Sequence, residues 1–254
     1  MVATAILSLL PISSYATVDW NERFEYASDT EFGTVWSHSC LGNPGISTAR
    51  PFTGAKSVKE VFPGGCYMER DLPVRSNTLY TRFYMYMENF TVDSTGTKIT
   101  RHEDSVAGYP GFWWGMPYGQ PNLSVSVEGI ISNSGVLITE NIHGGPIPQN
   151  QWVCIETRIT MSTPGVDNGI VQAWINGTQV MNKTNQRMRS ATLNQRNGPT
   201  VQIGRAKLYT QLGKGIIYYD DYAVSRDARI GCSGGGSTTG DLTPPTTPTG
   251  VIAR

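Results

Sequence analysis

One segment of the sequence combines phenols with a guanidinium at a spacing that could bind sugars. In the run from Leu79 to Met87, alternation places Tyr80, Arg82, Tyr84 and Tyr86 on one face of a strand, with apolar residues and a threonine on the other. Phenol rings stack on sugar rings, and a guanidinium grips hydroxyls or carboxylates. The alternative is a solvated aromatic ladder that stabilises the sheet through cross-strand pairs.

Two further segments place polar groups on one strand face in the same way. In 152–160, Glu156 and Arg158 share a face with Trp152 and Cys154, and in 170–176 the shared face carries Gln172, Trp174 and Asn176. If these strands neighbour 79–87, their polar faces form one concavity suited to a glycan. An ordinary solvent-facing sheet has a similar pattern and remains the alternative.

A cationic cluster stands close to aromatic residues in the segment 96–118. Lys98, Arg101 and His102 supply the cations, and Trp113 and Trp114 lie between two glycines. We expect the tryptophans to form a platform at the rim of a binding site; a packed loop anchor is the alternative. His143 is expected in a loop, where a lone histidine is more often structural than catalytic.

Oxygen ligands for a metal are predicted near the end of the chain. Asp220 and Asp221 are adjacent in an otherwise apolar run, and paired carboxylates of this kind can hold a structural Ca²⁺. Glu22 or Glu25 could complete the set. Alternatively, backbone donors or an arginine satisfy the two aspartates. No motif requires a cofactor.

The elements that must position these residues are short strands. Hydrophobic residues recur with period two, and Gly, Pro, Asn and Asp separate the runs. Asn176-Gly177 indicates a two-residue hairpin turn. The pattern predicts an all-β fold, an antiparallel β-sandwich or jelly roll, and excludes a long helical domain. The predicted strands are 79–87, 123–127, 152–160, 170–176, 200–203 and 216–224.

Four cysteines suit an oxidising compartment, and none has the short paired spacing of a zinc site. We favour Cys40–Cys66, which closes a short polar loop, and Cys154–Cys232, which ties the last strand to a central one. Free thiols are the alternative.

Composition divides the chain into three parts. Residues 1–16 are apolar and end in a small-x-small pattern, which predicts part of a signal peptide and hence secretion; a first core strand is the alternative. Residues 17–232 carry the strands. Residues 233–254 begin as a Gly/Ser/Thr linker and end in a proline-rich stretch that resembles the start of a fibronectin type III module. We therefore expect further modules after this one.

Charge narrows the classes of partner. The 254 residues have a formal net charge of zero, and only 16% are charged. This balance argues against nucleic acid and anionic membrane surfaces as partners. No run of eighteen or more apolar residues follows the leader, so no membrane span is expected. Nucleophile-elbow, phosphate-loop and His-Glu-x-x-His motifs are absent from the sequence.

Residues 18–232 resemble the concanavalin A-like (LamG-like) jelly rolls of secreted microbial polysaccharide lyases and related sugar-binding domains. The resemblance is carried by the stretches 61–71, 82–86, 152–156, 163–177 and 219–225. It implies β-elimination from a uronate polymer, in which a cation neutralises the substrate carboxylate and a tyrosine, histidine or lysine moves the proton. Chosen by residue type and strand face, the catalytic candidates are Arg82, Tyr84, Lys98 and His102, and the substrate-binding candidates are Tyr86, Trp113, Trp114, Glu156, Arg158, Gln172 and Trp174.

Two other functions stay open at this point. A non-catalytic carbohydrate-binding or adhesion module would have the same strand faces, and linkers and fibronectin-like neighbours are typical of such modules. A glycoside hydrolase with a dispersed carboxylate pair is a third reading.

Overall fold

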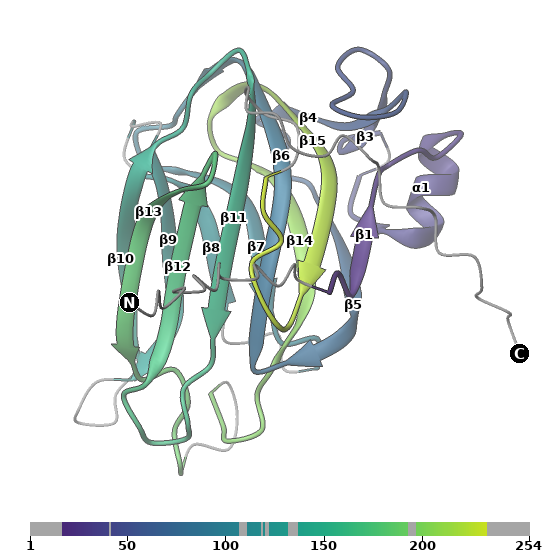
Figure 1. The fold of residues 1–254 in the computed structure, drawn as a ribbon. Coiled ribbons are helices and arrows are strands. Elements are labelled where there is room, and N and C mark those ends of the chain that lie inside the picture. The colour runs from purple at the N-terminus through teal and green to yellow at the C-terminus, as the bar shows by residue number, and fades with distance from the viewer. Residues whose placement is uncertain are drawn as a thin grey trace, which may run out of the picture.

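A computed structural model describes residues 17–40, 42–106, 111–117, 119, 122–131, 137–192 and 197–232. In this part of the chain two antiparallel sheets stack face to face, as Figure 1 shows, and the only helix is short. This is the predicted β-sandwich of the jelly-roll type. The expected leader, 1–16, and the expected linker and module start, 233–254, lie outside the described residues.

The first sheet, called sheet A, contains the aromatic strand predicted at 79–87. Its central strand β6 pairs with β11 on one side and with β15 on the other. The order is β13 (Thr178–Gln186), β12 (Gly169–Ile175), β11 (Trp152–Thr160), β6 (Thr78–Thr91), β15 (Lys214–Ser225), β4 (Ser57–Phe62) and β3 (Gly45–Ser47), with β1 (Trp20–Glu22) also on β15.

The second sheet, called sheet B, contains the cationic segment. Its order is β10 (Leu137–Pro146), β9 (Asn122–Ile131), β8 (Gly111–Met116), β7 (Thr97–Glu103), β14 (Ile203–Gln211), β5 (Tyr67–Ser76) and β2 (Ser37–His38). Helix α1 (Asp29–Val35) begins at Ser28, whose hydroxyl accepts a hydrogen bond from the backbone N–H of Glu31. It lies at the edge of the sandwich beside β1 and β3 (Figure 1).

Five of the six predicted strands fall within observed ones, to within a residue. The predicted turn also forms: Asn176 and Gly177 have φ of 48° and 82°, and Ile175 pairs with Thr178 across them. The strand predicted at 200–203 is wrong, because the strand begins at Ile203 and continues to Gln211. Alternating Arg205, Lys207 and Tyr209 make this strand look polar in sequence, although the residues between them are buried.

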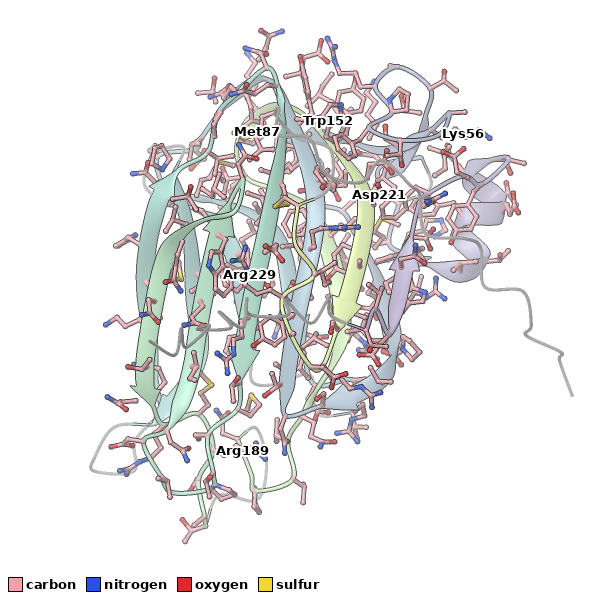
Figure 2. All side chains as sticks on the ribbon, in the orientation of Figure 1. Lys56, Met87, Trp152, Arg189, Asp221 and Arg229 are labelled. Atoms are coloured by element: carbon pink, nitrogen blue, oxygen red, sulfur yellow. A yellow bond between two sulfur atoms is a disulfide. The ribbon has the colours of Figure 1, made fainter. Side chains whose placement is uncertain are left out.

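Both favoured disulfides are present. Cys40–Cys66 joins segments 26 residues apart, and Cys154–Cys232 joins β11 to the chain beyond β15. The second bond holds residues 226–232 against the outer face of sheet A. In Figure 2, Arg229 of this segment lies in front of the sheet. No helix in the described residues is long and apolar enough to cross a membrane.

A polar chain crosses the hydrophobic core between the sheets. The indole Nε1 of Trp114 in β8 donates to Nδ1 of His102 in β7 at 3.0 Å, and His102 Nε2 lies 2.6 Å from the hydroxyl of Tyr222 in β15. Because Nδ1 accepts, the neutral ring carries its proton on Nε2 and donates to Tyr222. All three side chains are fully buried, and burial lowers the pKa of His102 to about 3.

This buried imidazole makes stability depend on pH. The pKa is 6.5 ordinarily and about 3 in the folded chain, so between these values only the unfolded state binds the proton. The free energy of unfolding should therefore fall by about 1.4 kcal/mol per pH unit as the pH drops through this window. His102→Gln supplies an amide that can accept from Trp114 and donate to Tyr222. In urea unfolding, the dependence of its unfolding free energy on pH should correspond to one proton fewer than in the wild type.

The matched control is His143→Gln, which removes an exposed imidazole from β10 and should keep the wild-type slope. Equal slopes in His102→Gln and the wild type would contradict the assignment of a buried neutral histidine.

Candidate functional site

The outer face of sheet A carries most of the residues that the sequence suggested for a groove. The three strands concerned are neighbours in the order β12, β11, β6, and Glu156 lies between Arg82 and Trp174 in the register. The expected sharing of one polar face by these strands is therefore confirmed. Whether this face is a groove depends on what covers it.

Two segments of the chain cover this face. Residues 226–232 lie over its middle: Arg229 pairs with Glu156 and stacks on Trp174 at 4.3 Å, and the Gly231 N–H donates to Glu156 at 2.8 Å. Arg82 donates to the Gly231 carbonyl at 3.5 Å. As a result Glu156 is only 2% exposed and Trp174 only 7%.

The loop between β3 and β4 covers the next part of the face. Phe52 stacks on Tyr84 with ring centroids 3.7 Å apart, leaving Tyr84 1% exposed. Tyr86 packs against Arg50 and Trp152. These aromatic residues stabilise the sandwich through contacts with the chain itself. Tyr86 makes the cross-strand pairs of the alternative noted for the 79–87 strand, but Tyr84 is covered by Phe52 and is not solvated.

Farther along the same face, polar side chains bond to one another. Arg158 donates to Gln172 at 3.2 Å, and Gln172 donates to Asn182 at 2.8 Å. Of the sheet A candidates, Arg82, Tyr86, Arg158 and Gln172 keep partial exposure to solvent.

The carboxylates proposed for calcium hold the β3–β4 loop in place. Asp220 accepts hydrogen bonds from the backbone N–H groups of Phe52 and Thr53, Asp221 accepts from the Thr53 hydroxyl, and Glu25 accepts from two further N–H groups of the loop. Burial raises the pKa of Asp220 to about 7, against the opposing effect of these N–H groups. Among the described residues, no group of three or more His, Cys, Asp and Glu is arranged to hold a metal. Backbone N–H groups thus bond to Asp220 and Glu25, and a side-chain hydroxyl bonds to Asp221. Calcium stays a prediction.

The outer face of sheet B is different because charged and aromatic side chains line up across four strands. Register places Glu69, Lys207, Arg101 and Trp113 side by side on β5, β14, β7 and β8. One row away, Tyr209 pairs with Tyr67. These residues, together with Lys98, Glu103, Arg205 and Asp71, are called the sheet B cluster.

Carboxylates fix the cations of the cluster in position. Lys207 Nζ lies 2.6 Å from Glu69 Oε2 and 2.9 Å from Glu103 Oε1. Arg205 Nε lies 2.6 Å from Asp71. Burial alone would lower the pKa of Lys207, but its hydrogen bonds to Glu69 and Glu103 outweigh that effect and raise the pKa. Lys207 is therefore a permanent cation in the neutral pH range.

Trp113 is the aromatic centre of the cluster. The Lys98 ammonium lies 3.9 Å and the Arg101 guanidinium 4.2 Å from its ring centroid. Arg101 passes over Gly111, where an added Cβ would come within 2.5 Å of the guanidinium, so the absent side chain makes room for it. Arg101 also meets Glu103 at 2.9 Å. This packing leaves Arg101 only 8% exposed beside the indole.

Tyr209 stands beside this centre. Its ring centroid lies 4.7 Å from that of Trp113 and 5.8 Å from that of Tyr67. Burial raises the pKa of the Tyr209 phenol, and the charges of Lys207 and Arg101 offset that rise only in part. A phenol flanked by two cations and an aromatic platform can exchange a proton with a bound sugar next to a neutralised carboxylate.

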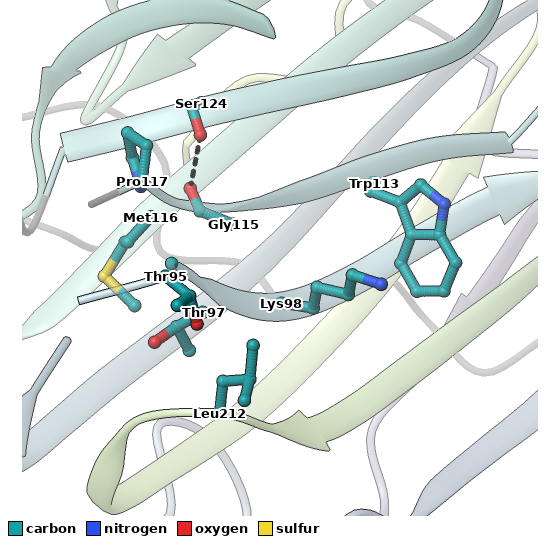
Figure 3. Close-up of a pocket in the computed structure, with 10 residues that line it drawn as sticks. Thr95, Thr97, Lys98, Trp113, Gly115, Met116, Pro117, Ser124 and Leu212 are labelled. Atoms are coloured by element: carbon teal, nitrogen blue, oxygen red, sulfur yellow. Dashed lines mark hydrogen bonds between the residues drawn. The ribbon is translucent and has the colours of Figure 1, made fainter. Parts of the chain in front are cut away.

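A pocket of about 210 Å³ opens beside Trp113 and Lys98 (Figure 3). Lys98 and Trp113 form one end of it, and Met116 and Pro117 form the other. The Ser124 hydroxyl, which also lines it, donates to the Gly115 carbonyl at 3.3 Å.

The sequence candidates divide between these places. Lys98 and Trp113 lie in the sheet B cluster, whereas His102 and Trp114 are fully buried in the core and cannot contact a polymer in solvent. The prediction that His102 and Trp114 form part of the site is therefore wrong. Because β7 and β8 are strands, neighbouring residues point to opposite faces of the sheet. The tryptophan pair therefore divides into one platform and one core residue.

Sequence reasoning missed Tyr209, Lys207 and Glu103. The available signal was the period-two pattern of 205–209, which places Arg205, Lys207 and Tyr209 on one strand face. Only the pairing of β14 with β5 and β7 brings them to Glu69, Arg101 and Trp113, and that pairing joins segments more than a hundred residues apart.

No protein-family model matches this sequence, and no curated protein matches it significantly. Solved structures do share its fold. The PL-14 alginate lyase from Aplysia kurodai matches with a TM-score of 0.62 at 13% identity, over 83% of this chain and all (100%) of that one.

Two further solved structures match over a similar share of this chain. The cellulose induced protein Cip1 matches with a TM-score of 0.56 at 14% identity, over 85% of this chain and 100% of that one. The endo-β-1,4-glucuronan lyase from the fungus Trichoderma reesei matches with a TM-score of 0.54 at 10% identity, over 84% of this chain and 94% of that one. At these identities the likeness shows the fold: the chain has the β-sandwich found in polysaccharide lyases.

Proposed function

We propose that this chain is a secreted polysaccharide lyase that cleaves a uronate-containing polymer by β-elimination on the outer face of sheet B. The observation that carries the proposal is the position of Tyr209 between the Trp113 platform and the cations Arg101 and Lys207. The two disulfides suit an extracellular setting. Similar structures named as alginate and glucuronan lyases support the same choice of reaction and of a polysaccharide partner.

In the proposed step, a uronate ring stacks on Trp113 and its carboxylate pairs with Arg101. The Tyr209 phenolate takes the proton from C5, and Arg101 stabilises the negative charge that develops on the carboxylate. The bond between C4 and the glycosidic oxygen then breaks and a C4=C5 double bond forms. Tyr209 returns the proton to the departing oxygen, which becomes the anomeric hydroxyl of the leaving sugar. The phenolate is thereby regenerated, and no further reactant is consumed.

The first test replaces the phenol. Tyr209→Phe should lower kcat by about 10²–10⁴-fold, because the proton has no carrier, while the variant still binds the polymer through Trp113 and the cations. Activity is followed by the ultraviolet absorbance of the unsaturated uronate on a panel of uronate polymers. Tyr86→Phe is the matched control, since it removes a phenol from the outer face of sheet A, and it should keep wild-type activity.

Each result identifies a different function. If Tyr86→Phe loses activity and Tyr209→Phe keeps it, the active site lies on the outer face of sheet A and the proposed site is wrong. Binding by the wild type without unsaturated product would leave a carbohydrate-binding module, and new reducing ends without unsaturation would indicate hydrolysis.

The second test uses pH. The active form of Tyr209 is the phenolate, and burial raises the pKa of this phenol above its ordinary 10.0. The phenolate fraction therefore grows with pH, and kcat/KM should rise about tenfold per pH unit through the neutral range. Lys207→Met removes a charge that lowers this pKa, so its profile should shift to higher pH. A profile that levels off near neutrality would exclude Tyr209 as the base.

A further inference from the structure

The pocket beside Trp113 has the size and walls of a site for one sugar ring. Its volume of about 210 Å³ is below the range of roughly 300–1,000 Å³ that drug-sized ligands occupy. Trp113, Thr97 and Ser124 all line it. The Thr97 hydroxyl accepts from the Asp93 N–H at 3.3 Å, and the Ser124 hydroxyl donates to the Gly115 carbonyl at 3.3 Å. An aromatic face with a few polar groups around it is the usual lining of a sugar site.

The charge among the described residues that line this pocket is that of Lys98. None of the described lining residues carries a carboxylate. The carboxylates of the sheet B cluster, Glu69, Asp71 and Glu103, lie on the rows of β5 and β7 that are farther from the pocket. Asp93, which precedes the pocket in the β6–β7 turn, accepts hydrogen bonds from the Thr95 N–H at 2.8 Å and the Thr95 hydroxyl at 2.6 Å.

Trp113 lines the pocket and also contacts Tyr209. The indole meets the Tyr209 ring at 4.7 Å, while the Lys98 ammonium lies 3.9 Å from the indole centroid and reaches it from the pocket (Figure 3). Arg101 approaches the same ring at 4.2 Å. Two cations therefore flank one aromatic residue, so two carboxylates of one polymer can be bound within the length of neighbouring sugars.

We infer that this pocket is a single-sugar subsite that receives a second uronate, next to the uronate held by Arg101 and Tyr209, with its carboxylate on Lys98. The inference rests on the proposed function for the position of the first uronate. With this subsite, Lys98 determines specificity. The preferred substrates are polymers in which uronates follow one another, and polymers in which each uronate stands between neutral sugars are disfavoured.

Direct binding tests this subsite apart from catalysis. Calorimetry compares a uronic acid trisaccharide with the same trisaccharide after its carboxylates are reduced to alcohols. The wild type should bind the acidic form more tightly, and Lys98→Met should lose about tenfold to hundredfold in affinity for it while binding the reduced form as before. Lys59→Met, on β4 of sheet A, is the matched charge control and should bind as the wild type does.

A second variant fills the pocket while keeping Lys98. Thr95 is exposed at the rim, so Thr95→Trp should fold and should weaken both trisaccharides by closing the space. Circular dichroism and thermal unfolding check that both variants are folded.

The outcomes separate the inference from the function. Trisaccharide binding that depends on Lys98, without any unsaturated product from the wild type, would support the subsite and overturn the lyase. Cleavage by the wild type with equal trisaccharide affinity in Lys98→Met would support the lyase and overturn the subsite. Equal wild-type affinity for the acidic and reduced trisaccharides would also overturn it.

Discussion

The apolar core between the two sheets is crossed by a chain of buried hydrogen bonds, from Trp114 through His102 to Tyr222. It is a polar link inside an apolar core, and each member loses its partner if its strand slips by one residue. A slip of β7 or β8 would also turn Arg101 and Trp113 inward and His102 and Trp114 outward. The buried link therefore determines which residues of these strands face the solvent, and the sheet B cluster depends on it.

The cluster also shows how a binding surface can hold fixed cations in a chain without net charge. Three carboxylates, Glu69, Asp71 and Glu103, hold Lys207 and Arg205 through contacts of 2.6–2.9 Å. These pairs reduce the net positive charge that a polyanion would meet. They also keep each cation in a fixed position, and stabilising a transition state depends more on fixed positions than on overall attraction. Balanced composition alone is therefore weak evidence against an acidic substrate.

Much of the fold was open to prediction because it depends on local patterns. Period two gave the strands 79–87, 152–160 and 216–224 and their inward faces, and Asn176-Gly177 gave its turn. The cysteine pairs were predictable because one pair closes a short polar loop and the other ties the last strand to a central strand.

The site was harder to predict because it depends on which strands pair and on what covers each face. Nothing local says that residues 226–232 lie over Glu156 and Trp174, or that Phe52 stacks on Tyr84. The same alternation occurs on both sheets, and only long-range pairing shows that one outer face is covered by the chain while the other presents Tyr209.

The bond between Cys154 and Cys232 has a mechanical consequence. The described chain ends at Cys232, and this residue is covalently joined to β11 in the interior of sheet A. A pulling force applied to the chain beyond Cys232 would pass directly into β11, bypassing the hydrogen bonds that hold β15 between β6 and β4. The sandwich can therefore bear tension from that side without β15 being peeled away, and the force enters through the sheet opposite the sheet B cluster.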